Sequence, residues 1–226
     1  MSNNTALIAG SSGLVGSSLV NQLINDNYYQ KVIVLTRRPL GLTDPKVEEV
    51  VVEDFDTLAS AQEQLIAQDY FCCLGTTIKQ AGSKEQFKKV DLEYPLELAR
   101  IAQKSPSYKH FLIVTAAGAN ADSPLFYNQV KGEVEEQLRA MKISGLKVFR
   151  PSLLLGDRRD FRLGEEIAKF VSNLFSFFMV GLKRKLWSIK ASDVAKSMLL
   201  VAKEQRPGYR VYNSNDMIKR ISSFGF

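Results

Sequence analysis

Tyr127 and Lys131 stand four residues apart, which places both side chains on one face of a helix. A phenol with a pKa of about 10 is a poor acid–base catalyst at neutral pH, but a neighbouring ammonium group lowers that pKa. Thr115, earlier in the chain, has a hydroxyl that can donate to a substrate carbonyl or orient Tyr127. These three residues form the predicted catalytic set, for proton transfer to a carbonyl oxygen. The alternative is an exposed pair at a helix start, with Tyr127 packed on the sheet edge.

A glycine-rich turn near the N-terminus predicts a site for a pyrophosphate. It follows the apolar run 5–8 and precedes apolar residues at helical spacing. Gly10 allows the tight turn, Gly13 lets phosphates approach the backbone, and Gly16 lets the helix pack closely on the sheet. Backbone N–H groups and the helix dipole then bind the anion. The predicted contacts are Gly10, Ser11, Ser12, Gly13, Leu14, Val15 and Gly16.

The end of the second apolar run, 31–36, indicates which dinucleotide binds. NAD sites normally have a carboxylate about 20 residues beyond the glycines, for the ribose hydroxyls. This chain has Thr36, Arg37 and Arg38 there instead. A guanidinium group suits a 2′-phosphate, which a carboxylate would repel. The sequence therefore predicts NADP (NADPH) as the cofactor, although a solvated basic turn is the alternative for the arginines.

The rest of the chain alternates apolar strands with helical segments. Strands are expected at 5–8, 31–36, 47–52, 70–74, 110–115 and 146–150, with a last short one at 209–212. Helices are expected near 58–67, at 92–104 with Asp91 as N-cap, from Tyr127 onward, and as a final helix capped at Ser192. This order predicts an α/β, doubly wound parallel sheet of the Rossmann type. We expect one domain over 1–226, with 151–226 as its C-terminal part.

Composition limits the functional classes. The formal charge of +6 comes from scattered Lys and Arg without a nucleic-acid-binding motif, so no nucleic-acid partner is expected. Cys72 and Cys73 are adjacent and are predicted to be core residues on opposite faces of a strand. His110 is the only histidine and is expected to be structural, so no metal site is predicted. Without a signal peptide or transmembrane segment, a cytoplasmic location is expected.

Several segments together resemble an atypical branch of the short-chain dehydrogenase/reductase superfamily, and most closely the family of HIV Tat-interacting oxidoreductase-like proteins. The resemblance covers nearly the whole chain and rests on the glycine turn, 73–77, 89–91, 127–135, 149–151 and 193–195. It implies a Rossmann fold that binds NADP(H), with Tyr127 as the acid–base residue and Lys131 on the nicotinamide ribose. It also implies cofactor contacts from Asp54, Phe55, Leu74, Gly75, Thr76, Thr77 and Pro151.

One departure from the superfamily concerns the catalytic serine expected near the end of the fifth strand. Thr115, Ala116 and Ala117 stand in that region. Thr115 keeps a hydroxyl on a stiffer side chain. If Ala116 or Ala117 is the true equivalent, the catalytic set is incomplete while cofactor binding is unaffected.

The expected function is reversible hydride transfer to a small carbonyl or alcohol substrate of unknown identity. A non-catalytic NADPH-sensing regulator that binds a protein partner is the alternative. A sugar-nucleotide epimerase or dehydratase is disfavoured, because only about 75 residues follow Arg150. The apolar and basic segment 167–185 is expected to be a substrate lid or a homodimer contact, with a peripheral membrane patch as the weaker alternative.

Overall fold

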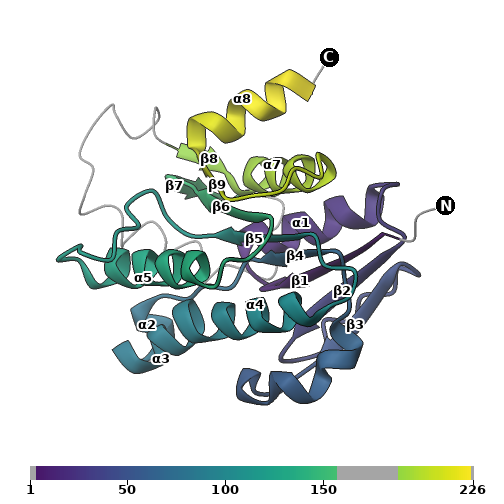
Figure 1. Cartoon of the computed structure of the whole chain (residues 1–226), viewed down its shortest axis with the longest axis horizontal. Coiled ribbons are helices and arrows are strands. Elements are labelled where there is room, and N and C mark those ends of the chain that lie inside the picture. The colour runs from purple at the N-terminus through teal and green to yellow at the C-terminus, as the bar shows by residue number, and fades with distance from the viewer. Residues whose placement is uncertain (1–3, 157–187, 225–226) are drawn as a thin grey trace.

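The computed structural model describes residues 4–156 and 188–224, and its centre is a seven-stranded sheet (Figure 1). Every neighbouring pair of strands is parallel. Across the sheet the strands are β3 (Val47–Val51), β2 (Lys31–Thr36), β1 (Thr5–Ala9), β4 (Asp69–Cys72), β5 (His110–Val114), β6 (Leu146–Arg150) and β9 (Arg210–Asn213). The strand order changes direction between β1 and β4, and the ligand crevice of such sheets lies outside the strand ends at that point.

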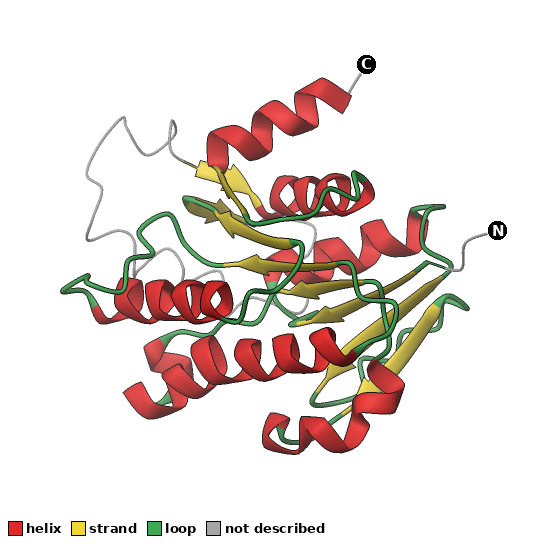
Figure 2. Cartoon of the chain, viewed as in Figure 1, coloured by secondary structure: helices red, strands yellow, loops and turns green. Residues whose placement is uncertain are grey.

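Helices cover both faces of this sheet (Figure 2). One face carries α1 (Leu14–Asn25), α7 (Ala191–Lys203) and α8 (Ser214–Phe224). The other carries the 3₁₀ segment η1 (Phe55–Leu65), α3 (Lys84–Lys88), the π turn η2 (Lys89–Glu93), α4 (Tyr94–Lys104) and α5 (Phe126–Ala140). The short helix α2 (Ile78–Ala81) precedes α3, and β7 (Leu153–Leu155) pairs with β8 (Ser188–Lys190) in a separate small sheet. The predicted doubly wound parallel fold is therefore confirmed.

Three predicted elements differ from the structure. The helix expected at 92–104 is the last part of a continuous helical run, 84–104, so Asp91 does not cap it. The segment near 58–67 is a 3₁₀ helix that begins at Phe55, after Asp54 accepts a hydrogen bond from the Asp56 amide. Helix α7 has no side-chain cap, and α8 follows it, so it is not the final helix.

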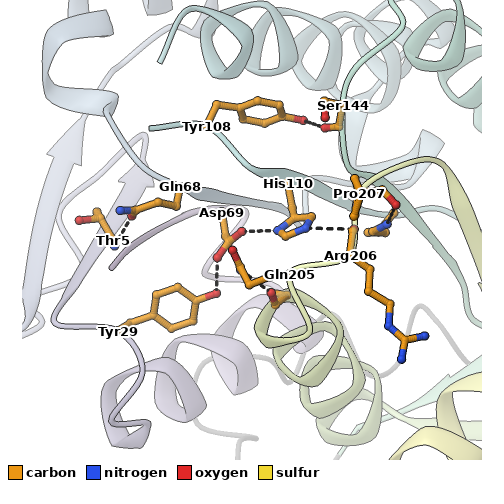
Figure 3. A network of polar contacts seen from close by, with 12 residues as sticks. Thr5, Tyr29, Gln68, Asp69, Tyr108, His110, Ser144, Gln205, Arg206 and Pro207 are labelled. Atoms are coloured by element: carbon orange, nitrogen blue, oxygen red, sulfur yellow. Dashed lines mark hydrogen bonds and ion pairs between the residues drawn. The ribbon is translucent and has the colours of Figure 1, made fainter. Parts of the chain in front are cut away.

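A buried polar network lies at the amino ends of the strands (Figure 3). The Tyr29 hydroxyl donates to Asp69 over 2.7 Å, and Nδ1 of His110 lies 2.6 Å from the other Asp69 oxygen. The second ring nitrogen of His110 donates to the Arg206 carbonyl at 3.2 Å. His110 thus connects the turn before β9 to the sheet through hydrogen bonds. This is the structural role that its position predicted.

The candidate site lies at the opposite edge, where β1, β4 and β5 end. Buried apolar strands position it, since the carboxyl ends of parallel strands open at one edge of the sheet. The predicted lid or dimer segment 167–185, by contrast, falls outside the described residues. Within the described ranges, no helix is long and apolar enough to cross a membrane.

Candidate active site

The segment that leads from β1 into the first turn of α1 requires glycine at two of its three glycine positions. Gly10 has a φ of +86°, and a Cβ there would lie 2.4 Å from the carbonyl oxygen of Cys73. A Cβ on Gly16 would lie 2.1 Å from the Gly10 carbonyl oxygen. A Cβ on Gly13, however, would approach no neighbouring atom more closely than 3.4 Å. Helix α1 also begins without a side-chain cap, so its first turn and the space at Gly13 suit an anionic ligand.

Two adjoining cavities follow the carboxyl ends of the strands. The larger, of about 440 Å³, extends from the glycine turn past the end of β2 to Phe55 and Tyr94. The smaller, of about 230 Å³, extends from the start of α1 to Tyr127, Lys131 and Pro151. Both are lined by Gly13 and by the segment 73–76. Together they give space for an extended ligand that crosses the sheet edge.

Most of the predicted site residues line these two cavities. The set comprises Gly10, Ser11, Ser12, Gly13, Leu14, Val15, Thr36, Arg37, Phe55, Leu74, Gly75, Thr76, Thr77, Thr115, Tyr127, Lys131 and Pro151. Three predicted contacts, Gly16, Arg38 and Asp54, line neither cavity. Gly16 instead supports the backbone packing of the turn.

The far end of the larger cavity has an aromatic wall. The rings of Phe55 and Tyr94 stack with centroids 4.9 Å apart and an interplanar angle of 27°. Asp54, beside them, accepts hydrogen bonds from the Asp56 amide and the Tyr94 hydroxyl. The hydrogen bond from the Asp56 amide lowers the pKa of the Asp54 carboxyl, and the positive charges of Lys89 and Arg37 add to this effect. This end can therefore hold a flat ring against Phe55, with a carboxylate nearby.

The two arginines after β2 occupy different places. Arg37 lines the larger cavity, whereas Arg38 belongs to a turn in which its carbonyl accepts a hydrogen bond from Thr36 at 2.8 Å. Both side chains are exposed. Of the pair, Arg37 is the one placed to meet a phosphate in the cavity.

Tyr127 lies in the first turn of α5, with its ring 5.8 Å from that of Phe87. Burial raises the pKa of Tyr127; Lys131 acts to lower it, and Asp91 adds to the rise. The predicted lowering of this pKa is therefore wrong. The ammonium group does act in the expected direction, but desolvation and a carboxylate outweigh it.

Lys131 is buried and is held by Asp91. Its Nζ lies 2.7 Å from Oδ1 of Asp91, while Oδ2 accepts a hydrogen bond from the Thr76 amide at 2.9 Å. Burial acts to lower the pKa of Lys131, but Asp91 and Tyr127 outweigh burial and leave it well above its usual range. The lysine therefore stays charged next to Tyr127.

Asp91 is the functional candidate that sequence reasoning missed. Its position in the sequence predicts a helix cap, a local role that needs no distant partner. The available signal was its place among apolar residues in Val90–Leu92, together with the expectation that a buried Lys131 needs a counterion. The π turn at Lys89–Glu93 places this carboxylate inside the fold.

Thr115 does not orient Tyr127. Its hydroxyl donates to the buried Glu135 at 2.6 Å, and Glu135 is also held by Arg150 through its Nε and Nη2 groups. Thr115 still lines the smaller cavity beside Ala116, which has no hydroxyl. The predicted role of Thr115 as an aid to Tyr127 is thus corrected, because its proton is committed to Glu135.

The two cysteines lie on opposite faces of the sheet, as predicted. Cys72 belongs to the core beneath α4 and α5, and Cys73 packs against the core beneath α1. Burial raises the pKa of the Cys72 thiol to about 12, so it is neutral and unreactive. Across residues 4–156 and 188–224 no group of three or more His, Cys, Asp and Glu side chains is placed to hold a metal ion.

The chain is 38% identical to Protein HTATIP2 of Rattus norvegicus over 88% of this chain and 81% of that protein. It is 30% identical to the mitochondrial protein FMP52 of Candida albicans over 97% and 99% of the two chains. Further yeast FMP52 relatives are also named as mitochondrial. These names overturn the expected cytoplasmic location.

Solved structures agree with this fold. UDP-glucose 4-epimerase of Thermotoga maritima, solved with UDP-glucose, superimposes with a TM-score of 0.66 at 20% identity over 92% of this chain and 76% of its own. The Bordetella bronchiseptica enzyme WbmF in complex with NAD⁺ gives 0.68 at 16% identity over 94% and 73%. The sequence profile described as the NAD dependent epimerase/dehydratase family matches residues 6–213. The chain therefore belongs to the NAD dependent epimerase/dehydratase family, with HTATIP2 and FMP52 proteins among its relatives.

Proposed function

We propose that this protein is an NADP(H)-dependent oxidoreductase that reduces a small carbonyl compound, with Tyr127 as the proton donor. The observation that carries the proposal is that Tyr127 and Lys131 line the same cavity as the start of α1 and the 74–77 segment. An acid–base pair and a dinucleotide-binding turn thus open into one space. The family to which the chain belongs supports a nicotinamide cofactor.

The residues that would hold the cofactor follow from the two cavities. The amides of the glycine turn and the start of α1 would bind its pyrophosphate. Phe55 would contact the adenine, and Arg37 would meet the 2′-phosphate that distinguishes NADP from NAD. Lys131 would meet the nicotinamide ribose. The absence of a carboxylate from the Thr36–Arg38 turn is what favours NADP.

The chemistry divides between cofactor and protein. The bound nicotinamide supplies or accepts the hydride. Tyr127 gives its phenolic proton to the substrate oxygen as the carbonyl carbon accepts the hydride, and the phenolate then regains a proton from water. Lys131 stabilises that phenolate while it exists. The smaller cavity has a largely apolar wall that includes Leu14, Val114 and Leu154, which suits a small apolar carbonyl compound.

Turnover with a panel of small aldehydes and ketones tests this proposal. Tyr127→Phe is expected to reduce kcat by at least about 100-fold with NADPH binding retained. Tyr108→Phe is the matched control, because Tyr108 donates to Ser144 at the opposite edge of the sheet. Equal loss in both variants, or full activity in Tyr127→Phe, would remove Tyr127 from the mechanism.

The NADPH-sensing regulator remains the second candidate, favoured by the engagement of Thr115 with Glu135. In that case NADPH binds with unchanged affinity in Tyr127→Phe, and no carbonyl substrate of the panel is turned over. Including UDP-glucose in the panel tests the epimerase chemistry named in the family description. For location, the names of the fungal relatives support mitochondria, which fractionation of the source cells tests.

A further inference from the structure

The ion pair between Asp91 and Lys131 is a built feature of the site. Both side chains are nearly inaccessible to solvent, at 0% and 6% exposure. The other Asp91 oxygen is fixed by the Thr76 amide, and a Cβ on Gly75 would lie 3.6 Å from Asp91 and 3.7 Å from Lys131. The cavity-lining segment 75–76 therefore packs directly against the pair.

The backbone of this region is shaped for the same contact. Asp91 is the middle residue of the π turn that interrupts the helical run 84–104. Such turns insert one extra residue and redirect a side chain, often at functional sites. Here the turn packs against α5, the helix that carries both Tyr127 and Lys131. Burying two charges costs desolvation free energy, which their mutual attraction offsets only in part. The position of this pair beside Tyr127 therefore indicates a role in the site.

We propose that Asp91 is a positioning residue: its carboxylate holds Lys131 in place and offsets the lysine charge beside Tyr127, so that the phenol stays protonated to a higher pH than it would beside Lys131 alone. This inference rests on the proposed role of Tyr127. An uncompensated Lys131 would stabilise the phenolate more strongly and lower the pH at which Tyr127 ionises. The counterion therefore sets the pH above which Tyr127 is a phenolate, the form that accepts a proton from an alcohol in the reverse reaction.

The charges around the phenol are consistent with this balance. The ionisable groups that act on one another here are Tyr127 and Lys131 of α5, Asp91 of the π turn and Cys72 of β4. Cys72 stays neutral, since burial raises its pKa to about 12. Lys131 and Asp91 act on the pKa of Tyr127 in opposite directions. Removing Asp91 alone would thus leave one positive charge acting on the phenol.

Ultraviolet difference titration of the tyrosines measures this effect without any substrate. Subtracting the Tyr127→Phe spectrum isolates the ionisation of Tyr127 in each background. In Asp91→Asn, that ionisation is expected at least about one pH unit lower than in the parent protein. Glu93→Gln is the matched control, since this carboxylate is exposed on the same π turn and should leave the titration unchanged. An unchanged Tyr127 titration in Asp91→Asn would overturn the proposal.

A second variant covers the case in which Asp91→Asn does not fold. Asp91→Asn combined with Lys131→Met removes both charges, and its Tyr127 ionisation is expected within about half a pH unit of the parent value. A shift as large as that expected for Asp91→Asn would show that the two charges do not offset each other. This measurement needs no turnover. If the protein showed no reductase activity but Asp91→Asn still lowered the pH at which Tyr127 ionises, the proposed function would fail while the role of Asp91 would stand.

Discussion

Nζ of Lys131 lies 2.7 Å from Oδ1 of Asp91, and the residues that form this pair stand 40 positions apart in the chain. The contact ties α5 to the π turn before α4, and through the Thr76 amide it also ties both to the loop after β4. Three segments of the site are thus joined around one carboxylate. The position of Tyr127 depends on these segments as well as on its own helix.

Removing the arginine that lines the cavity should remove most of the preference for NADPH. We expect the parent protein to bind NADPH at least about ten times more tightly than NADH, a difference of about 1.4 kcal/mol. Arg37→Ala should lose most of this preference, because Arg37 faces the larger cavity. Arg38→Ala is the matched control and should keep it. Titration calorimetry measures both affinities, and equal affinities in the parent protein would contradict the prediction.

The sheet was predictable because its signal is local and repeated. The strands 31–36 and 146–150 have the predicted bounds, since each is an apolar run ended by polar or glycine-containing segments. The glycine turn was also readable, because backbone requirements at Gly10 and Gly16 demand that residue type. Local patterns of this kind do not depend on which distant residues come into contact.

The polar contacts within the site were not predictable in this way. The four-residue spacing correctly predicts that Lys131 lies near Tyr127. Whether the pKa of Tyr127 rises or falls, however, depends on burial and on Asp91. Thr115 has the hydroxyl that the predicted catalytic role needs, but only the fold shows that this hydroxyl donates its hydrogen bond to Glu135. Each of these effects arises between segments far apart in the chain. Spacing along one helix or strand carries no information about them.

The raised pKa of Tyr127 predicts how the reaction depends on pH. Burial, the largest cause, keeps the phenol protonated through neutral pH, so carbonyl reduction should be nearly independent of pH until above pH 10. Alcohol oxidation needs the phenolate and should instead rise with pH over the same range. Initial rates in both directions, at saturating cofactor, measure the two profiles. The prediction would be contradicted if the reduction rate already declined with rising pH before about pH 9 and if this decline were absent in Tyr127→Phe.

Breaking the network at the amino edge should affect stability without affecting the site. His110→Phe removes both ring hydrogen bonds and leaves the Asp69 carboxylate buried without its histidine. A loss of about 2–3 kcal/mol in the free energy of unfolding is expected. Tyr29→Phe removes one hydroxyl from the same carboxylate and should cost about 1 kcal/mol.

Urea unfolding gives these free energies, and calorimetry gives the affinity for NADPH. Where a variant remains folded, its affinity for NADPH should match that of the parent protein, because the network lies at the opposite edge of the sheet from the cavities. A weakened affinity in folded Tyr29→Phe would show that the two edges are coupled.

Removing one member of the central pair should be more damaging than removing both. Lys131→Met leaves the Asp91 carboxylate buried without its cation, which should cost about 3–5 kcal/mol of stability. Asp91→Asn with Lys131→Met replaces the pair by uncharged groups and should recover most of that loss. Urea unfolding of the two variants measures the difference. A double variant less stable than Lys131→Met would mean that the pair stabilises the fold by itself.

Alanine at three glycines should separate folding from ligand binding. Gly132→Ala should destabilise the protein although alanine normally favours a helix, because its Cβ would lie 2.1 Å from the backbone carbon of Asn120. Gly16→Ala should do the same through the Gly10 carbonyl. Gly13→Ala has the space for a methyl group and should fold normally, yet bind NADPH at least about tenfold more weakly, since the methyl occupies the surface that the phosphates approach. Thermal unfolding and calorimetry on the same samples make the comparison. A Gly13→Ala variant that binds NADPH like the parent protein would place the pyrophosphate elsewhere.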